Sequence, residues 1–269
     1  MNKNYKCINS FALKMIAIIT MVIDHVGAVL FPMNMIFRYI GRISFPLFVF
    51  LLVEGSIHTS KIRKYELRMF LFALISEIPF DLAFSNEIVD IHSQNVFWTL
   101  TIGLVMLDLI QNGASYVKGH KGKMLQEVWI EGQPIPMVWQ FVVVAVCACV
   151  AQALQTDYGA GGILLIYFIW MLHENVIAQA VAFVIISLLF FGSVELPGVI
   201  AFLPIFCIME RKVHRQNTCF TRLSGAFVYF ASIQMSTAFC VYHILSMIFV
   251  WLWKKDVCEI LHVILVRVS

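Results

Sequence analysis

Residues 11–31 read FALKMIAIITMVIDHVGAVLF, an apolar run that includes Lys14, Asp24 and His25. A helix needs about 20 mainly apolar residues to cross the hydrocarbon core of a bilayer. Backbone groups have no water to bond there, so such a run is expected to be a helix that satisfies them internally. The run therefore predicts a membrane-spanning helix that carries ionisable side chains.

The rest of the chain has the same character. Of its 269 residues, 61% are hydrophobic and 13% are charged, whereas soluble globular proteins carry about a quarter charged residues. This composition excludes a soluble enzyme, and a net charge of +3 is too small to indicate nucleic-acid binding. Lys3 and Lys6 resemble the start of a signal peptide, but Asp24 and His25 lie inside the apolar run, so we expect the segment to be retained.

Similar apolar runs recur along the chain and predict an all-α, polytopic membrane bundle with about nine spans, in a range of about eight to ten. We expect residues 1–269 to form a single membrane domain, with one larger polar loop at about residues 111–135 on the cytoplasmic side. The expected spans are residues 11–31, 35–57, 65–84, 95–110, 136–154, 159–172, 176–191, 194–209 and 223–253.

Basic residues gather in alternate loops, and short loops rich in Lys and Arg stay on the cytoplasmic side. This pattern predicts a cytoplasmic N-terminus. The basic stretches are the N-terminus and residues 61–64, 118–123 and 211–215, and the acidic groups expected in outward loops are Glu87, Asp90, Asp157 and Glu195.

Ionisable side chains within the spans are the informative ones, because each costs about 2.5 to 3.5 kcal/mol near the bilayer centre and persists only if something compensates it. Projected onto the expected orientation, several of them fall into one layer near the outward face. The members of this predicted layer are Asp24, His25, Arg38, Arg42, Glu77, Asp81, Asn95 and His243.

Helical spacing indicates which of these groups share a face. Lys14 and His25 are three turns apart and lie on one stripe, whereas consecutive helix positions point about 100° apart. Asp24 is therefore a poor partner for its neighbour His25, and an arginine suits it better. We expect His25 to meet Glu77 or Asp81 instead. Pro79, between those two, should kink the helix.

Two interpretations of these charges stay open. They form either structural ion pairs that hold helices in register or a functional site, and intramembrane charges favour function by default. His25 favours function more strongly because imidazole titrates near neutrality, as a general base requires. We find no metal-ligand spacing and no nucleophile or phosphate-binding motif.

Several blocks, in order along the chain, resemble the TraX family. They are LKMIAIITMVIDHVGAVLFP (residues 13–32), FRYIGRISFPLFVFLLVEGSIHTSKIRKYELR (37–68), RMFLFALISEIPFDLAF (68–84), NVFWTLTIGL (95–104) and DYGAGGILLI (157–166). The family is named for a protein that acetylates the N-terminal amine of pilin subunits. The resemblance therefore implies a bacterial inner-membrane acyltransferase that takes its acetyl group from acetyl-CoA.

By position, the resemblance points to Asp24, His25, Arg42, Glu54, Pro79 and Asn95. The spacing from Lys14 to His25 is also similar to the first-helix motif of membrane acyltransferases that modify sugars, so the acceptor is a protein amine or a glycan hydroxyl. The chain departs from the family near His243, where related proteins show F-Y-P-x-H and this chain reads FCVYH. That departure puts the role of His243 in doubt.

A mechanism for acyl transfer can be drawn from these residues. We expect His25 to act as a base or as a transient acyl acceptor, and Arg42 or Asn95 to hold the oxyanion. Basic groups on the cytoplasmic side could dock the coenzyme A phosphates, although the positive-inside rule explains them without a ligand. The expected donor-binding residues are Lys14, Glu54, Lys61, Arg63, Lys64, Arg68 and Arg211.

Two rival functions fit the same residues. A proton-coupled transporter would use the buried charges as a relay, and the apparent lack of repeated halves counts only mildly against it. A noncatalytic membrane scaffold fits the dense polar layer less well. The expected partners are therefore the lipid bilayer, a small-molecule acyl donor and an acceptor, and the oligomeric state is left open.

Overall fold

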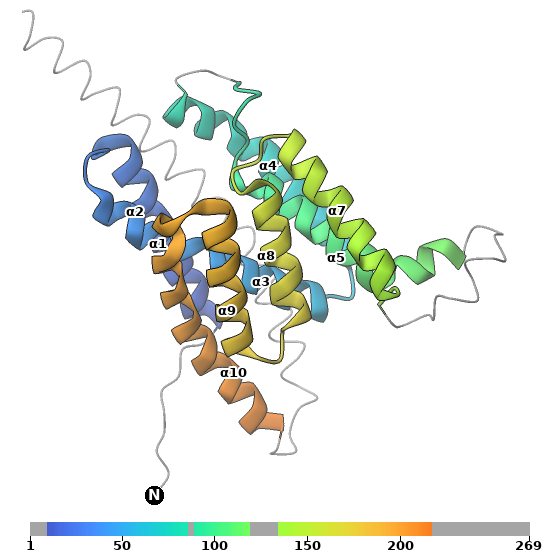
Figure 1. The fold of residues 1–269 in the computed structure, drawn as a ribbon. Coiled ribbons are helices and arrows are strands. Elements are labelled where there is room, and N and C mark those ends of the chain that lie inside the picture. Colours follow the sequence, from blue (N-terminus) through green and yellow to red (C-terminus); the bar gives the residue numbers. More distant parts are fainter. Residues whose placement is uncertain (1–9, 86–88, 119–133, 217–269) are drawn as a thin grey trace, which may run out of the picture. The chain divides into compact units, whose positions relative to one another are not determined.

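The computed structural model describes residues 10–85, 89–118 and 134–216, and this part is almost entirely helical (Figure 1). Within it, the only strand-like pairing is an isolated bridge between Gln94 and Thr156. The helices are α1 (Ser10–Leu30), α2 (Met35–Gly41), α3 (Ser44–His58), α4 (Ile62–Phe84), α5 (Val96–Lys118), α7 (Met137–Ala153), α8 (Gly159–Met171), α9 (Val176–Ile186) and α10 (Phe202–Gln216). The all-helical fold class is confirmed.

Two further segments depart from α-helical geometry. A π-helix, η1 (Ser187–Phe191), follows α9, and a 3₁₀-helix, η2 (Ser193–Ala201), leads into α10. Gly192 joins them with φ of 79°, a left-handed conformation that favours glycine. Pro197 lies inside η2 and cannot donate a backbone hydrogen bond.

Proline and capping residues explain several helix boundaries. α1 ends at Leu30, shortly before Pro32, because the residue that precedes a proline is disfavoured in helical geometry. The side chain of Asn34 accepts a hydrogen bond from the Ile36 amide at 3.1 Å and caps the start of α2. Pro136 occupies the N-cap position of α7.

Three helical runs are long and apolar enough to cross a bilayer: Phe11–Leu30, Met35–His58 and Val96–Gly113. Four shorter apolar helical runs cover Met137–Ala153, Gly159–Met171, Val176–Phe191 and Ser193–Met209. The chain is therefore a membrane protein with transmembrane helices. The count of about nine spans stays a prediction, and the expected span at residues 223–253 lies outside the described residues.

The structure adds one interruption and corrects one expected boundary. The span expected at residues 35–57 is present as the helical run Met35–His58, which is interrupted at Arg42 and Ile43 between α2 and α3. The loop expected at residues 111–135 begins too early, because α5 continues to Lys118. The polar residues Gln111 and Asn112 stay in the helix because each has a partner, Ser56 and Asp108 respectively.

The chain divides into two compact units. Unit 1 comprises Met1–Phe48, Ile75–Asp90 and Val176–Ser269, and unit 2 comprises Val49–Leu74 and Ile91–Asn175. In the described part of unit 1, α1 packs on α2, and α2, α9 and α10 contact η2. In unit 2, α5, α7 and α8 pack against one another.

Each unit has an apolar interior with a close helix contact. In unit 1 the rings of Phe183 and Phe202 lie 5.6 Å apart, centre to centre. In unit 2 Gly103 of α5 faces α8 so closely that a Cβ atom there would come within 2.3 Å of Ile166. Glycine at this position lets the two helix backbones approach.

Candidate functional site

One ion pair in unit 1 joins α1 to α2. Arg38 Nη1 donates to Asp24 Oδ2 at 2.9 Å, and both side chains are partly buried. Gly41, one turn after Arg38, lies against the same carboxylate, since a Cβ atom there would come within 2.3 Å of Asp24 Oδ1. Gly27 of α1 makes a similar close approach to Phe37 of α2. The expectation that Asp24 takes an arginine as its partner is confirmed.

His25 is the neighbour of Asp24 on α1, and it is buried. Its ring meets Phe84 of α4 edge to face, with the ring centres 5.8 Å apart. Phe84 lies one turn beyond Asp81, so the end of α4 that carries the expected carboxylates reaches His25. A direct contact of His25 with Glu77 or Asp81 stays a prediction.

A second ion pair joins the break after α2 to the 3₁₀-helix. Arg42 Nη1 lies 3.1 Å from Glu195 Oε2, and the two side chains are only 15% and 4% exposed. Arg42 is the C-cap of α2, where its own amide bonds to the carbonyls of Arg38 and Ile40. Gly198 of η2 lies against the Arg42 carbonyl. A Cβ atom at Gly198 would be 2.7 Å from the carbonyl oxygen. Two interruptions of α-helical geometry therefore meet at Arg42.

The last turns of α4 carry a third polar group in unit 1. Asp81 is fully buried, and its Oδ2 accepts a hydrogen bond from the Asp90 amide at 2.8 Å. The Ser85 hydroxyl donates to the Asp90 carboxylate at 2.7 Å. Glu77 is partly buried on the same helix, which continues through Pro79 to Phe84. These contacts join the end of α4 to Asp90.

Asn95, expected in the same layer, belongs to unit 2. Its Oδ1 accepts from the Phe97 amide at 2.9 Å, and its Nδ2 donates to the Ala73 carbonyl at 3.0 Å. The side chain thus caps α5 and ties its start to α4. Its catalytic role stays a prediction. His243 lies outside the described residues.

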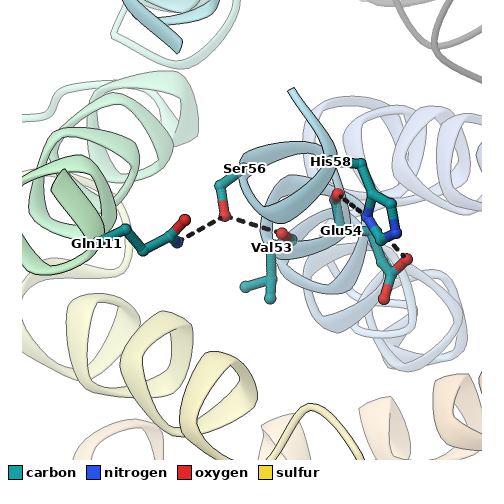
Figure 2. A network of polar contacts seen from close by, with 5 residues as sticks. All are labelled: Val53, Glu54, Ser56, His58 and Gln111. Carbon is teal, nitrogen blue, oxygen red and sulfur yellow. Dashed lines mark hydrogen bonds and ion pairs between the residues drawn. The ribbon is translucent and has the colours of Figure 1, made fainter. Parts of the chain in front are cut away.

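Most of the expected donor-binding groups lie in unit 2, around the end of α3 and the start of α4. Figure 2 shows the end of α3, where Glu54 and Ser56 lie on different sides of the helix. The His58 ring nitrogen Nδ1 lies 2.9 Å from the Glu54 carbonyl and 3.8 Å from the Glu54 carboxylate. On the other side, Gln111 of α5 donates to the Ser56 hydroxyl at 3.3 Å, and Ser56 donates to the Val53 carbonyl.

The basic groups near the start of α4 differ in their surroundings. Lys61 and Lys64 are exposed, whereas Arg68 donates to the Lys64 carbonyl at 3.0 Å. Arg63 lies beside the carboxylates of Glu66 and Asp108, 3.3 Å and 3.7 Å away. An anionic ligand would therefore meet the two lysines without first breaking an ion pair. The other two expected groups belong to unit 1: Lys14 is partly buried in α1, and Arg211 lies in α10.

Two buried acids were missed in the sequence. Glu195 was expected in an outward loop, but it lies within η2 and is 3% exposed. Its carboxylate pairs with the buried Arg42 guanidinium, although Val194 and Ile200 of the same 3₁₀-helix are exposed. Glu66 was overlooked because it lies among the basic residues at the start of α4, yet it is 8% exposed. In the sequence, Glu195 is a lone acid between Val194 and Leu196. This apolar context was the available signal that it is buried.

The family model for TraX, described as "TraX protein", matches residues 10–220. This chain belongs to the TraX family. The match includes every residue of the two ion pairs described above. No solved structure matches the chain.

One curated relative has a name that concerns fimbrial assembly. The chain is similar to the "Probable fimbrial assembly protein FimC, serogroup H1" of Dichelobacter nodosus, with 36% identity over 111 residues. The matched part is 37% of this chain and 45% of the relative, so it spans less than half the length of that protein.

Proposed function

We propose that this TraX-family protein is an acetyltransferase of the bacterial inner membrane that uses acetyl-CoA. The acceptor we favour is the N-terminal amine of a pilin-like subunit, with a glycan hydroxyl as the other candidate. One observation carries the proposal: a buried imidazole, His25, follows Asp24 of the Asp24–Arg38 ion pair in the sequence of a membrane helix of a TraX-family chain. A titratable base in apolar surroundings suits proton removal near neutral pH.

In the proposed reaction the acceptor amine attacks the thioester carbonyl carbon. A C–N bond forms, the C–S bond breaks, and coenzyme A leaves as the thiol. His25 takes the proton that the amine must lose and returns it to the leaving sulfur. Arg42, which Glu195 holds at 3.1 Å, stabilises the negative charge on the carbonyl oxygen in the transition state. Asp24 and Arg38 position the helix that carries His25.

The donor and the acceptor are assigned on different grounds. For the donor, the exposed side chains of Lys61 and Lys64 offer positive charge to the coenzyme A phosphates. For the acceptor, the name of the similar protein from Dichelobacter nodosus concerns fimbrial assembly. The likeness to the TraX family implies that the acceptor is pilin. Transfer across the membrane would bring an acetyl group from the cytoplasm to an outward-facing subunit.

The test is an acetylation assay with protein purified in lipid nanodiscs. Labelled acetyl-CoA is supplied with a peptide that carries a pilin-like N-terminus, and the product is identified by mass spectrometry. The variant His25→Ala should lower the rate by about 10² to 10⁴, the usual contribution of a general base. His173→Ala is the matched control, because His173 lies at the end of α8 and outside the proposed site.

The outcomes separate the alternatives. Peptide acetylation that requires His25 supports the amine acceptor, and labelled product only with glycan supports the hydroxyl acceptor. A folded protein that neither binds nor hydrolyses acetyl-CoA would contradict the enzyme. Equal rates for His25→Ala and His173→Ala would remove His25 from the mechanism.

A proton-coupled transporter is the second candidate, and one feature favours it. The break after α2 and the 3₁₀-helix η2 meet through Arg42 and Glu195, and interrupted helices line the substrate sites of many transporters. Proton-dependent uptake of a solute into vesicles that contain the protein would support this function. Acetyl transfer without such uptake would exclude it.

A further inference from the structure

A separate polar cluster lies in unit 2, between the start of α4 and the second half of α5. Arg63 and Glu66 come from α4, and Asp108 and Asn112 come from α5. Arg63 Nη1 lies 3.3 Å from Glu66 Oε2, and Arg63 Nε lies 3.7 Å from Asp108 Oδ2. Asn112 donates to Asp108 Oδ1 at 2.8 Å. The function proposed above uses neither acid.

Both acids are withdrawn from solvent. Glu66 is 8% exposed and Asp108 is 1% exposed, whereas the side chain of Arg63 is 64% exposed. The cluster therefore has two buried acids and one arginine that reaches the surface. If both acids are ionised, the three side chains carry a net charge of −1 in surroundings where uncompensated charge is costly.

The geometry of the two acids identifies what compensates this charge. Arg63 lies 3.3 Å from the Glu66 carboxyl group and 3.7 Å from that of Asp108, so the two acids approach one guanidinium from α4 and α5. Two ionised carboxylates are acceptors only, so a hydrogen bond between them requires a proton on one. Glu66 Oε1 has no hydrogen-bond donor among the described residues although it is buried. Asp108, in contrast, already accepts from Asn112.

We propose that Glu66 is a proton-binding site: its carboxyl group is protonated and donates a hydrogen bond to the Asp108 carboxylate. Arg63 then balances the single remaining negative charge, and its exposed end marks the route by which the proton exchanges with water. A metal ion fits less well, because two carboxylates already beside a guanidinium supply too few oxygen ligands for a hard cation.

Other polar groups on α3, α5, α7 and α8 near this end of unit 2 have partners of their own. On α3, Glu54 and His58 contact each other. Gln111, next to Asn112, bonds to Ser56. α7 and α8, which pack on α5, contribute the bonded pair of Gln140 and Tyr167. Among these groups, Glu66 and Asp108 are the two acids that share one basic partner.

The site has a consequence for the packing of α4 on α5. Loss of the proton leaves two ionised carboxylates side by side with one guanidinium, and like charges at that distance repel. Acidic conditions should hold the helices together, and alkaline conditions should loosen them next to the exposed lysines Lys61 and Lys64. This holds whether the protein is a transferase or a transporter, so the proposal does not rest on either function.

Infrared spectroscopy tests the proposal directly, because a protonated carboxyl group has a carbonyl band that a carboxylate lacks. Spectra of the whole protein in lipid are compared at neutral and alkaline pH for the wild type, Glu66→Gln and Asp108→Asn. We expect each variant to lose one protonated carboxyl per molecule at neutral pH. In Asp108→Asn the loss arises because Glu66 alone with Arg63 forms an ordinary ion pair. Glu54→Gln is the matched control and should keep the band.

Labelling with a carbodiimide identifies which residue is protonated, because the reagent reacts with protonated carboxyl groups in apolar surroundings. The label, located by peptide mass spectrometry, should fall on Glu66, weaken as the pH rises, and drop at least tenfold in Asp108→Asn. In Arg63→Gln, labelling of Glu66 should persist to a higher pH than in the wild type. A neutral-pH infrared spectrum unchanged by Glu66→Gln would overturn the proposal, and so would equal labelling of Glu66 in the wild type and Asp108→Asn.

Discussion

The two units handle buried charge in different ways. In unit 1 each arginine of the broken second segment meets its own carboxylate: Arg38 meets Asp24 at 2.9 Å and Arg42 meets Glu195 at 3.1 Å. In unit 2 a single arginine, Arg63, lies beside two acids. The matched pairs of unit 1 can stay ionised together, whereas the cluster of unit 2 has one negative charge too many.

This difference indicates that the two units have different roles. Matched ion pairs at the meeting point of two helix interruptions fix geometry, as a site that orients reacting groups requires. A cluster with an excess acid responds to pH instead, because one of its groups must gain or lose a proton. We infer that unit 1 positions the chemistry and that unit 2 senses protons.

The largest expected effect comes from breaking the Arg42–Glu195 pair. Glu195→Ala leaves a buried guanidinium without its carboxylate, and removing one member of a buried pair costs about 3 to 5 kcal/mol. Thermal unfolding in detergent should show a marked loss of stability. The double variant Arg42→Ala, Glu195→Ala should be less damaged than the sum of the single variants. Strict additivity would mean that the pair does not couple the two segments.

Removing the charge of Asp24 should have a smaller effect. Asp24→Asn keeps the shape of the side chain but leaves Arg38 without a charged partner, and a hydrogen bond to a charged group contributes about 1.5 to 3 kcal/mol. The partial exposure of Arg38 places the loss in the lower part of this range. Unfolding in a denaturing detergent measures this loss of stability. A loss equal to that of Glu195→Ala would show that the two pairs of unit 1 are equally buried.

Alanine at two glycines compares helix contacts in the two units. Gly41→Ala would place a Cβ within 2.2 Å of the Asp24 Cβ, which forces α1 and α2 apart at a cost of about 1 to 3 kcal/mol. Gly55→Ala meets only the Tyr65 ring, at 3.0 Å, and should cost less. Thermal shifts of the two variants measured side by side would check this order. The reverse order would mean that unit 2 is packed more tightly at this contact.

The smallest expected effect is the loss of the Gln111–Ser56 hydrogen bond. Hydrogen bonds between membrane helices contribute about 0.6 kcal/mol on average, and the donor–acceptor distance here is a long 3.3 Å. Gln111→Ala should therefore change the unfolding midpoint only slightly, with Gln152→Ala, outside this contact, as the control. A loss several times larger would show that the end of α3 depends on this bond.

Much of the fold could be predicted because apolar run length is a strong signal for helices in a bilayer. The start of α2 at residue 35 and the extent of α8 and α9 lay close to the expected positions. The break between α2 and α3 was not predicted, although Gly41 and Pro46 flank Ile43, because the apolar run continues through it and indicates a single span. Nor was the helical state of residues 111–118 predicted, because they look like a polar loop until the contacts of Gln111 with Ser56 and of Asn112 with Asp108 are known.

Part of the site could also be predicted. The 100° step between consecutive helix positions separated Asp24 from His25 and gave the carboxylate an arginine, as the structure confirms. The choice between Arg38 and Arg42 was left to tertiary packing, and so was the burial of Glu195. Both outcomes depend on a contact between residues more than 150 positions apart. Local periodicity carries no information about such a distant contact.

Composition and periodicity alone determined that this chain is helical, lies in a membrane and carries charges that its own side chains must compensate. Only the tertiary structure decided which charges meet, because pairing depends on helices that are distant in sequence. The reason is physical: the hydrophobic effect acts on each segment separately, whereas an ion pair requires two groups from different segments at one place.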